Sequence, residues 1–238
     1  MIFSTSNGLT RVLFILGMAV ALLGIASSAL AQRPPTDAEV KAYRGLHAAA
    51  ASGDATEIGQ LIAAGADREA RDGNGRTPLH VAAFRGQYDA ARALMRRGAD
   101  PNALDAQRYD IITIAAVADD LLMLQIALDG GGSARNVTSP YDGTALIAAA
   151  HLGHDRVVKM LIKADAPLDH VNNLGWTALI ESIVLGDGGP RHTETLRALV
   201  AAGANPNLAD RQDATPLALA RTRGYSTMVA ILEQAGAR

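Results

Sequence analysis

A motif returns about every 33 residues along this chain, and no other feature of the sequence constrains the fold as strongly. A leucine or isoleucine near the start of each unit recurs with steps of 33, 33, 34, 33 and 38 residues, and a Gly-Ala marker near the end recurs with steps of 33, 33, 34, 38 and 33. Both tracks give six units and place an insertion of about five residues in the fifth. A period of this length indicates stacked repeats, which present a long surface and favour binding over catalysis. The first track is Leu46, Leu79, Ile112, Leu146, Leu179 and Leu217, and the second is Gly65, Gly98, Gly131, Asp165, Gly203 and Gly236.

Each unit carries the signals of two short helices. In the second unit, Thr77 is expected to cap the first helix, and Pro78 follows at a position where a backbone N–H would have no partner anyway. The Leu-x-x-Ala-Ala run that continues the unit places a leucine anchor beside small residues, so that neighbouring units can pack closely. A second helix over 88–97 is stopped by Gly98. Left-handed glycines are expected to end the first helices at Gly53, Gly86, Gly153, Gly186 and Gly224.

The second unit begins Asp-Gly-Asn-Gly-Arg-Thr-Pro-Leu-His over Asp72–His80, and with this motif the chain resembles the ankyrin repeat family over about residues 43–238. The resemblance implies an all-α fold: a solenoid of about six helix-turn-helix units with hairpin-like fingers, stacked into a curved array with a concave binding face. Most members of the family bind other proteins. It also implies that His47 and His80 tie adjacent units together through their imidazoles. The units are expected at about 43–71, 72–104, 105–138, 139–171, 172–209 and 210–238.

The last four units depart from this pattern. The third replaces the threonine cap by Asp110 and has no proline after it, and the fourth has Asp165 where glycine is expected. The extra residues of the fifth unit fall within Leu185–His192 and are expected to lengthen the turn between its helices. The last unit ends at Arg238, directly after the Gly-Ala marker, and is expected to cap the stack without a finger of its own.

Residues 1–31 differ in composition from the rest. Arg11 is their only charged residue, an apolar run follows over 12–25, and an Ala-x-Ala pattern ends at Ala31. This layout is typical of a signal peptide for general secretion, cleaved after Ala31. An uncleaved membrane anchor is the alternative, because 12–31 is a stretch of 20 uncharged residues. Residues 32–42 are expected to form a linker and a capped helix, starting near Thr36, that covers the first repeat.

The charge of the chain argues against nucleic acid as a partner. Removal of residues 1–31 takes away Arg11 and no acid, which leaves 21 basic and 24 acidic residues and a formal net charge of −3. A weakly acidic protein lacks the excess of positive charge that attracts the phosphate backbone of a nucleic acid. The chain has no cysteine, so an exported protein of this sequence is stabilised by packing rather than by disulfides. Membrane contact is expected only transiently, through the signal peptide.

No pattern in the sequence predicts a catalytic site. There is no cysteine nucleophile, no serine in a strained elbow motif and no pair of carboxylates placed by the repeat register in one pocket. His151 and His154, beside Asp155, have a spacing that can bind a metal on one helix face, but Gly153 between them marks a helix end. The chain is therefore expected to be non-enzymatic, without metal or cofactor. The alternative is a metal- or ligand-binding protein that uses His151 and His154.

The functional prediction comes from the positions that the scaffold does not fix. By register, the residue after the motif histidine and the two residues after Ala-Ala project from the first helix onto the concave face. In the central units most of these residues are apolar, and a large exposed apolar patch usually marks a binding site. The alternative is that they pack against a finger. Ala118, Ala148 and Glu181 also occupy these repeat positions but are not predicted to bind. The expected binding residues are Val81, Phe84, Arg85, Ile114, Val117, His151, Leu152, Val184 and Leu185.

Aromatic residues of the fingers extend this prediction. Tyr109 and Trp176 directly precede the capping residue of their units, and Tyr141 lies close to the equivalent position in the fourth. Aromatic anchors often contribute most of the energy of an interface. The polar fingertips 68–71 and 208–211 are expected to form a rim that sets specificity. The binding core is expected to comprise Phe84, Val117, Leu152, Leu185 and Trp176.

Together these observations predict an exported, periplasmic or secreted monomer that binds another protein through the concave face and fingers of its stack. Such a protein would act as a scaffold, a stabiliser or an inhibitor of an envelope protein. A membrane-anchored scaffold is the alternative if residues 1–31 are retained.

Overall fold

The computed structural model describes residues 32–238, and the predicted signal peptide or anchor over 1–31 lies outside the described residues. Within 32–238 the chain forms thirteen α-helices and no β-strand, which confirms the all-α prediction. The short helix α2 (Asp37–Ala42) comes first, and six pairs of helices follow it.

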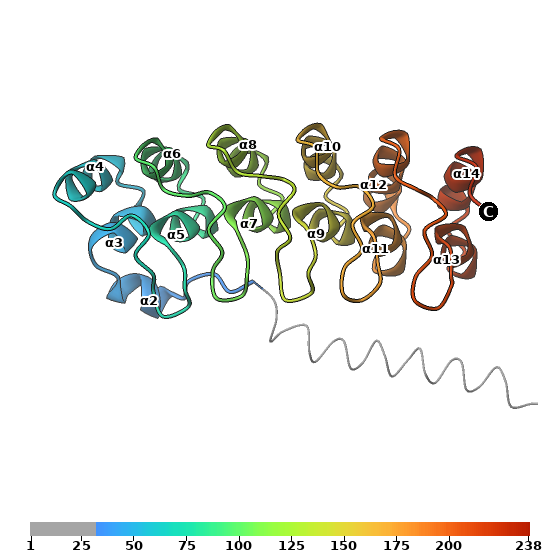
Figure 1. The fold of residues 1–238 in the computed structure, drawn as a ribbon, viewed down its shortest axis with the longest axis horizontal. Helices are drawn as coiled ribbons and strands as arrows, with labels where there is room; N and C mark the ends of the chain where they lie inside the picture. Colours follow the sequence, from blue (N-terminus) through green and yellow to red (C-terminus); the bar gives the residue numbers. More distant parts are fainter. Residues whose placement is uncertain (1–31) are drawn as a thin grey trace, which may run out of the picture. The chain divides into compact units, whose positions relative to one another are not determined.

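The pairs stack in chain order within the compact unit Pro34–Arg238, and each packs against its neighbours (Figure 1). The first helices of the pairs lie side by side and form an inner row, and the second helices form an outer row. The inner row comprises α3 (Gly45–Ser52), α5 (Pro78–Phe84), α7 (Ile111–Val117), α9 (Ala145–His151), α11 (Ala178–Val184) and α13 (Pro216–Thr222). The outer row comprises α4 (Ala55–Ala63), α6 (Tyr88–Arg96), α8 (Leu121–Asp129), α10 (Asp155–Lys163), α12 (Pro190–Ala201) and α14 (Ser226–Gln234).

Small residues allow the inner helices to pack closely. In each of the first four units, two consecutive alanines follow the leucine or isoleucine anchor within one turn and are buried with it, as Ala82 and Ala83 are after Leu79. Alanine lets neighbouring backbones approach while it still removes apolar surface from water, which is worth about 25 cal/mol per Å². One hydrophobic core therefore runs through the stack. The anchors Leu46, Leu79, Ile112, Leu146, Leu179 and Leu217 are all buried in it.

Side-chain caps start five of the six inner helices, all except α3. The Thr77 side chain accepts a hydrogen bond from the backbone N–H of His80, and threonines cap α9, α11 and α13 in the same way. In the third unit, Asp110 takes this role, since its Oδ1 accepts from the N–H of Thr113 at 2.8 Å. The helix start is therefore kept where threonine and proline are missing. Burial raises the pKa of Asp110.

Two histidines link neighbouring units, as the family resemblance implies. The Nε2 atom of His47 lies 3.0 Å from the carbonyl oxygen of Arg76, and that of His80 lies 3.0 Å from the carbonyl oxygen of Tyr109. Burial lowers the pKa of His80, which favours the neutral ring. With the proton on Nε2, this ring donates to Tyr109 while its Nδ1 accepts from the N–H of Thr77.

Left-handed residues end most of the inner helices, as predicted. In the third unit Asp119, with φ 56°, takes this position. The prediction for Gly186 is wrong, because the left-handed residue of that turn is Gly188, with φ 70°. Gly186 is required for space instead: a side chain there would collide with the carbonyl oxygen of Ser182 and the ring of His192. The predicted glycines with positive φ are Gly53, Gly86, Gly153 and Gly224.

The connections between the pairs form fingers that project from the inner row on one side (Figure 1). In the first finger, the backbone N–H of Asp72 donates to the carbonyl oxygen of Arg76, and Oδ1 of Asp72 accepts from the N–H groups of Asn74 and Arg76. The N–H of Ala106 in the second finger donates to the carbonyl oxygen of Asn74, so neighbouring fingers are joined. We call the backbone bond that joins the two ends of a finger its closing bond. In the later fingers the N–H groups of Asp105, Thr138, Asn172 and Asp210 donate this bond.

The insertion of the fifth unit lies partly in a turn and partly in a helix. Five residues, 185–189, connect α11 to α12, whereas three connect α5 to α6, and α12 has 12 residues where α6 has 9. The expectation of a longer turn is therefore correct only in part. The hydroxyl of Tyr225, from the sixth unit, donates to the carbonyl oxygen of Gly186 at 2.9 Å and holds the turn in place.

Candidate protein interaction surface

In the four central inner helices, α5, α7, α9 and α11, the exposed residues lie at the C-terminal ends. Leu152 directly follows α9 and Leu185 directly follows α11, and each is 40% exposed although leucine is usually buried. Because they occupy the same position in adjacent packed helices, whose axes are typically about 8–10 Å apart, their side chains lie on neighbouring parts of one surface. We call this surface the apolar row. It consists of Leu152 and Leu185 together with the half-buried Phe84, Val117 and Val184, and the exposed Arg85 lies at its N-terminal end.

Three of the residues predicted for the binding surface are buried, so their prediction as exposed contacts is wrong. Val81 and Ile114 lie inside α5 and α7, which pack against inner helices on both sides, so that only the last turn of each reaches the surface. Tyr109 packs into the core at the base of its finger, and burial raises its pKa to about 12. The repeat register therefore predicted exposure correctly for the two positions after Ala-Ala, but it predicted exposure wrongly for Val81 and Ile114, one helical turn earlier.

Two aromatic residues of the fingers are half-buried. The backbone of Trp176 closes its finger, since its carbonyl oxygen accepts from the N–H of Asn172 at 3.0 Å. The carbonyl oxygen of Tyr141 accepts from the N–H of Asn173 at 2.9 Å and joins two fingers. Both rings therefore sit on backbone that is held by neighbouring turns, and part of each side chain is accessible.

Two apolar residues of the fingers are exposed that the sequence pattern did not predict as binding residues. Val137 is 40% exposed and Val171 is 49% exposed. Each directly precedes the residue that starts the closing bond of its finger, Thr138 and Asn172 respectively. The repeat register contained the signal, because Leu104 occupies the same position 33 residues before Val137. The fingers of the central units therefore add apolar surface to that of the apolar row.

A buried carboxylate lies beside the apolar row. Glu181, in α11, is 5% exposed, and its Oε1 accepts a hydrogen bond from Nδ2 of Asn172 at 2.8 Å. Its Oε2 lies 3.4 Å from Nδ1 of His151, whose side chain is nearly half exposed. The position of Glu181 on this face follows from the repeat register, but its almost complete withdrawal from water does not.

The arrangement of the histidines does not favour the metal-binding alternative. His151 faces Glu181, whereas Nδ1 of His154 lies 2.9 Å from the carbonyl oxygen of Ala116 in the preceding unit. The two rings are therefore engaged with different neighbours. Within residues 32–238, no group of three histidine, cysteine, aspartate or glutamate side chains is placed to hold a metal ion.

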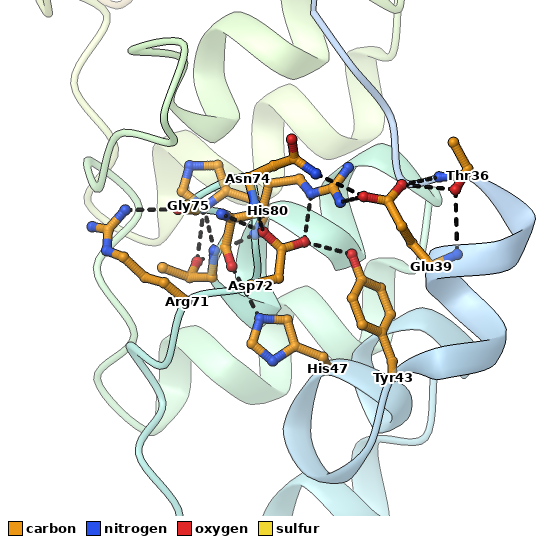
Figure 2. Close-up of polar contacts among 11 residues, drawn as sticks. Thr36, Glu39, Tyr43, His47, Arg71, Asp72, Asn74, Gly75 and His80 are labelled. Atoms are coloured by element: carbon orange, nitrogen blue, oxygen red, sulfur yellow. Dashed lines mark hydrogen bonds and ion pairs between the residues drawn. The ribbon is translucent and has the colours of Figure 1, made fainter.

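A second polar cluster closes the N-terminal end of the stack. Figure 2 shows Glu39 and Tyr43 converging on the first finger. The buried guanidinium of Arg76 contacts Glu39 at 2.7 Å and Asp72 at 2.6 Å, and the Tyr43 hydroxyl donates to Asp72 at 2.6 Å. Thr36 and Glu39 form the expected capping box at the start of α2. These groups satisfy one another, so the cluster fastens α2 to the first finger and is not a binding site.

A model described as "Ankyrin repeats (3 copies)" matches residues 16–105 and 112–210. The chain belongs to the ankyrin repeat family. It is 35% identical to the putative ankyrin repeat protein YahD of Escherichia coli K12, over 79% of this chain and 94% of that protein. Its fold is similar to that of an ankyrin repeat domain from Acinetobacter baumannii AYE, with a TM-score of 0.77 and 42% identity over 81% of this chain and 98% of that one. The ankyrin repeat domain of Bcl-3, a member of the IκB family, aligns over 82% of this chain and 87% of its own with a TM-score of 0.74 and 25% identity.

Ankyrin repeats are protein–protein interaction modules, and the fold is a non-enzymatic interaction scaffold. The family therefore supports binding to other proteins as the class of function. In the ankyrin stack of this chain, residues 32–238 contain no helix that is both long enough and apolar enough to cross a membrane.

Proposed function

We propose that this ankyrin repeat protein is exported to the periplasm and binds a partner protein through the apolar row and the adjoining fingers, without catalysing a reaction. It acts as a monomer and as a scaffold, stabiliser or inhibitor of an envelope protein. The stack is already ordered before it meets the partner, so little conformational entropy opposes association.

The observation that supports this proposal best is the pair of equivalent exposed leucines, Leu152 and Leu185. Each exposes 40% of its surface although the cores of both neighbouring units lie directly beneath. Val137 and Val171, on the fingers that directly precede the fourth and fifth units, expose comparable fractions. Apolar surface that recurs at equivalent repeat positions is a property of a face rather than of a single residue, and such faces mark interaction sites.

Export is supported by residues 1–31, whose single charge, apolar run and Ala-x-Ala pattern fit a cleaved signal peptide. Sequencing the N-terminus of the protein from a periplasmic fraction tests this part. A chain that begins at Gln32 agrees with cleavage, and a membrane fraction that retains Met1 contradicts it in favour of an anchor.

Binding is tested by capture of partners from an envelope extract with three forms of the protein. The wild type is compared with a Leu152→Asp/Leu185→Asp variant and with Leu122→Asp. Leu122 is the matched control, because it is 47% exposed but lies in the outer helix α8. We expect a partner that the wild type and Leu122→Asp retain and that the double variant loses while it remains folded. Capture that survives the double substitution would show that the apolar row does not bind the partner.

A further inference from the structure

Glu181 is the only charged residue at its repeat position. The equivalent residues of the other units are Ala48, Val81, Ile114, Ala148 and Leu219. A carboxylate in this position is withdrawn from water, which is unfavourable unless partners compensate for the lost hydration. The inner row therefore contains one charged group where packing alone would place an apolar residue.

The hydrogen bonding of Glu181 is unequal between its two oxygens. Oε1 has a normal bond, 2.8 Å long, from Nδ2 of Asn172. Oε2 has the His151 ring at 3.4 Å, which is longer than the usual 2.7–3.2 Å for an N–H donor and an oxygen. An ionised carboxylate offers about four acceptor sites. Oε2 therefore retains capacity for a stronger donor that approaches from the side of His151.

That side is the exposed one. His151 is the last residue of α9, its side chain is 47% exposed, and Leu152 follows it directly. Val184, the last residue of α11, and Leu185, its C-cap, come three and four residues after Glu181, so they lie on the same side of that helix. A group that reaches Oε2 past His151 thus passes over the apolar row.

The one arginine of the insertion, which contains no lysine, is already paired. Arg191 contacts Asp119 at 2.7 Å and Asp155 at 3.8 Å. Within the described residues, the contact to His151 is the one ion-pair contact of Glu181. The buried negative charge beside the apolar row is therefore available to a cation from outside the chain.

We propose that Glu181 binds a lysine or arginine side chain of an extended partner segment whose neighbouring apolar side chains pack on Leu152 and Leu185. This inference rests on the proposed function, because it assigns the partner chemistry of the same surface. A long cationic side chain fits both features: its aliphatic stem covers the apolar row, and its charged end reaches the carboxylate. Removing one partner of a charge pair that is shielded from water costs more affinity than removing one at the open surface, because the other charge is left buried and unpaired.

The test uses a displayed library of random dodecapeptides selected on the exported protein. We expect the enriched peptides to share one lysine or arginine flanked by apolar residues. Replacing that cationic residue of a selected peptide by methionine is expected to weaken its binding to the wild type by at least about thirtyfold, which corresponds to about 2 kcal/mol for a shielded charge pair. This measurement needs no variant of the protein.

Glu181→Gln provides the second arm. The glutamine keeps an oxygen for Asn172 but loses the charge, so the fold is expected to be retained. The variant should bind the selected cationic peptide as weakly as the wild type binds the methionine peptide, and it should hardly distinguish the two peptides. If Glu181→Gln binds the cationic peptide with unchanged affinity, the inference is overturned.

The Leu152→Asp/Leu185→Asp variant separates this inference from the proposed function. If peptides bind the apolar row but carry no common cation, the row is a binding surface and only the role of Glu181 is overturned. If the selected peptides bind this double variant as well as the wild type, both proposals fail. If no peptide is enriched, the row does not take an extended segment, which overturns the inference, and the capture experiment decides the proposed function.

Discussion

Arg191 and Asp119 form an ion pair at 2.7 Å, although 72 residues separate them in the sequence. Asp119 lies in the turn after α7, in the third unit, and Arg191 lies in α12, in the fifth. In a repeat stack each unit normally contacts only its neighbours. The insertion of the fifth unit therefore couples two units across the fourth, next to the turn that carries Leu152.

Arg191→Gln is expected to lower the free energy of unfolding by about 0.5–1 kcal/mol, because both members of the pair are partly exposed to solvent. The measurement is urea unfolding at low and at high salt, and the loss should shrink in high salt. Arg197→Gln is the control, since Arg197 pairs only with Glu194 three residues away in α12. Equal effects of the two substitutions on hydrogen exchange in the third unit would contradict coupling across the fourth.

Asp165→Gly is expected to stabilise the protein by about 0.5–1 kcal/mol. Asp165 has φ 58° in a position where the other units have glycine, and a residue with a side chain is strained in the left-handed region. The reverse change is the control: Gly203→Ala, at φ 96° with open space around the added methyl group, should destabilise by a similar amount. Thermal unfolding measures both. A decrease in stability of Asp165→Gly would show that the aspartate side chain makes a contact worth more than the strain.

The cluster at α2 predicts a dependence of stability on acid pH. The hydrogen bond from the Thr36 backbone lowers the pKa of Glu39. Burial alone would raise the pKa of Asp72, but hydrogen bonds from Tyr43 and Arg76 outweigh it and hold this pKa below its usual value. Both carboxyls have folded pKa values below their unfolded values, so their contribution is complete above an unfolded pKa of about 4 and is lost as the pH falls through the folded values.

Asp72→Asn tests this account of the cluster. At neutral pH the variant should be less stable by about 1–3 kcal/mol, because the charged acceptor of the buried Arg76 guanidinium and the partly buried Tyr43 hydroxyl is lost. The difference from the wild type should decrease as the pH falls from about 4 towards the lower pKa values of the folded carboxyls, because the unfolded wild type then binds protons that the folded cluster does not. Urea unfolding over a series of pH values measures it, and a difference that is independent of pH would exclude Asp72 as the titrating group.

Thr195→Val in α12 is expected to stabilise the protein by about 1 kcal/mol. The Thr195 hydroxyl is fully buried and has no hydrogen-bond partner among the described residues, and valine has nearly the same shape. Thr193→Val is the matched control, because the Thr193 hydroxyl donates to the carbonyl oxygen of Gly188 and its loss should destabilise. Chemical denaturation measures the free energy of unfolding of both variants and of the wild type. Loss of stability in Thr195→Val would indicate that this hydroxyl is hydrogen-bonded in solution.

The repeat period predicted the fold because it depends on local chemistry. Caps such as Thr77 and anchors such as Leu79 act within one helix, so their spacing determines the number and order of helices. The substitution of Asp110 for the threonine cap did not disturb this, since a carboxylate caps a helix equally well. Gly186 was misjudged because its requirement is for space beside the Ser182 carbonyl oxygen and the ring of His192, and only the folded insertion brings that ring near.

The candidate surface was predictable only where exposure follows from the position in the helix. Leu152 and Leu185 lie past the end of an inner helix, where no neighbour can cover them. Val81 and Ile114 lie one turn earlier, and their burial depends on how closely the next inner helix packs. The contacts of Arg191 with Asp119 and of Glu181 with His151 join different units. They could therefore not be predicted from the spacing of residues within one unit.

The central claim, that the apolar row binds the partner protein, is tested most directly by one affinity measurement. A captured and purified partner is titrated with the wild type, with Leu152→Asp/Leu185→Asp and with Leu122→Asp. Two leucines in the centre of an interface predict a loss of affinity of at least about a hundredfold for the double variant. The Leu122→Asp control should bind within about threefold of the wild type, because rim and outer positions contribute little. Equal affinity of the double variant and the wild type, with the double variant folded, would contradict the account.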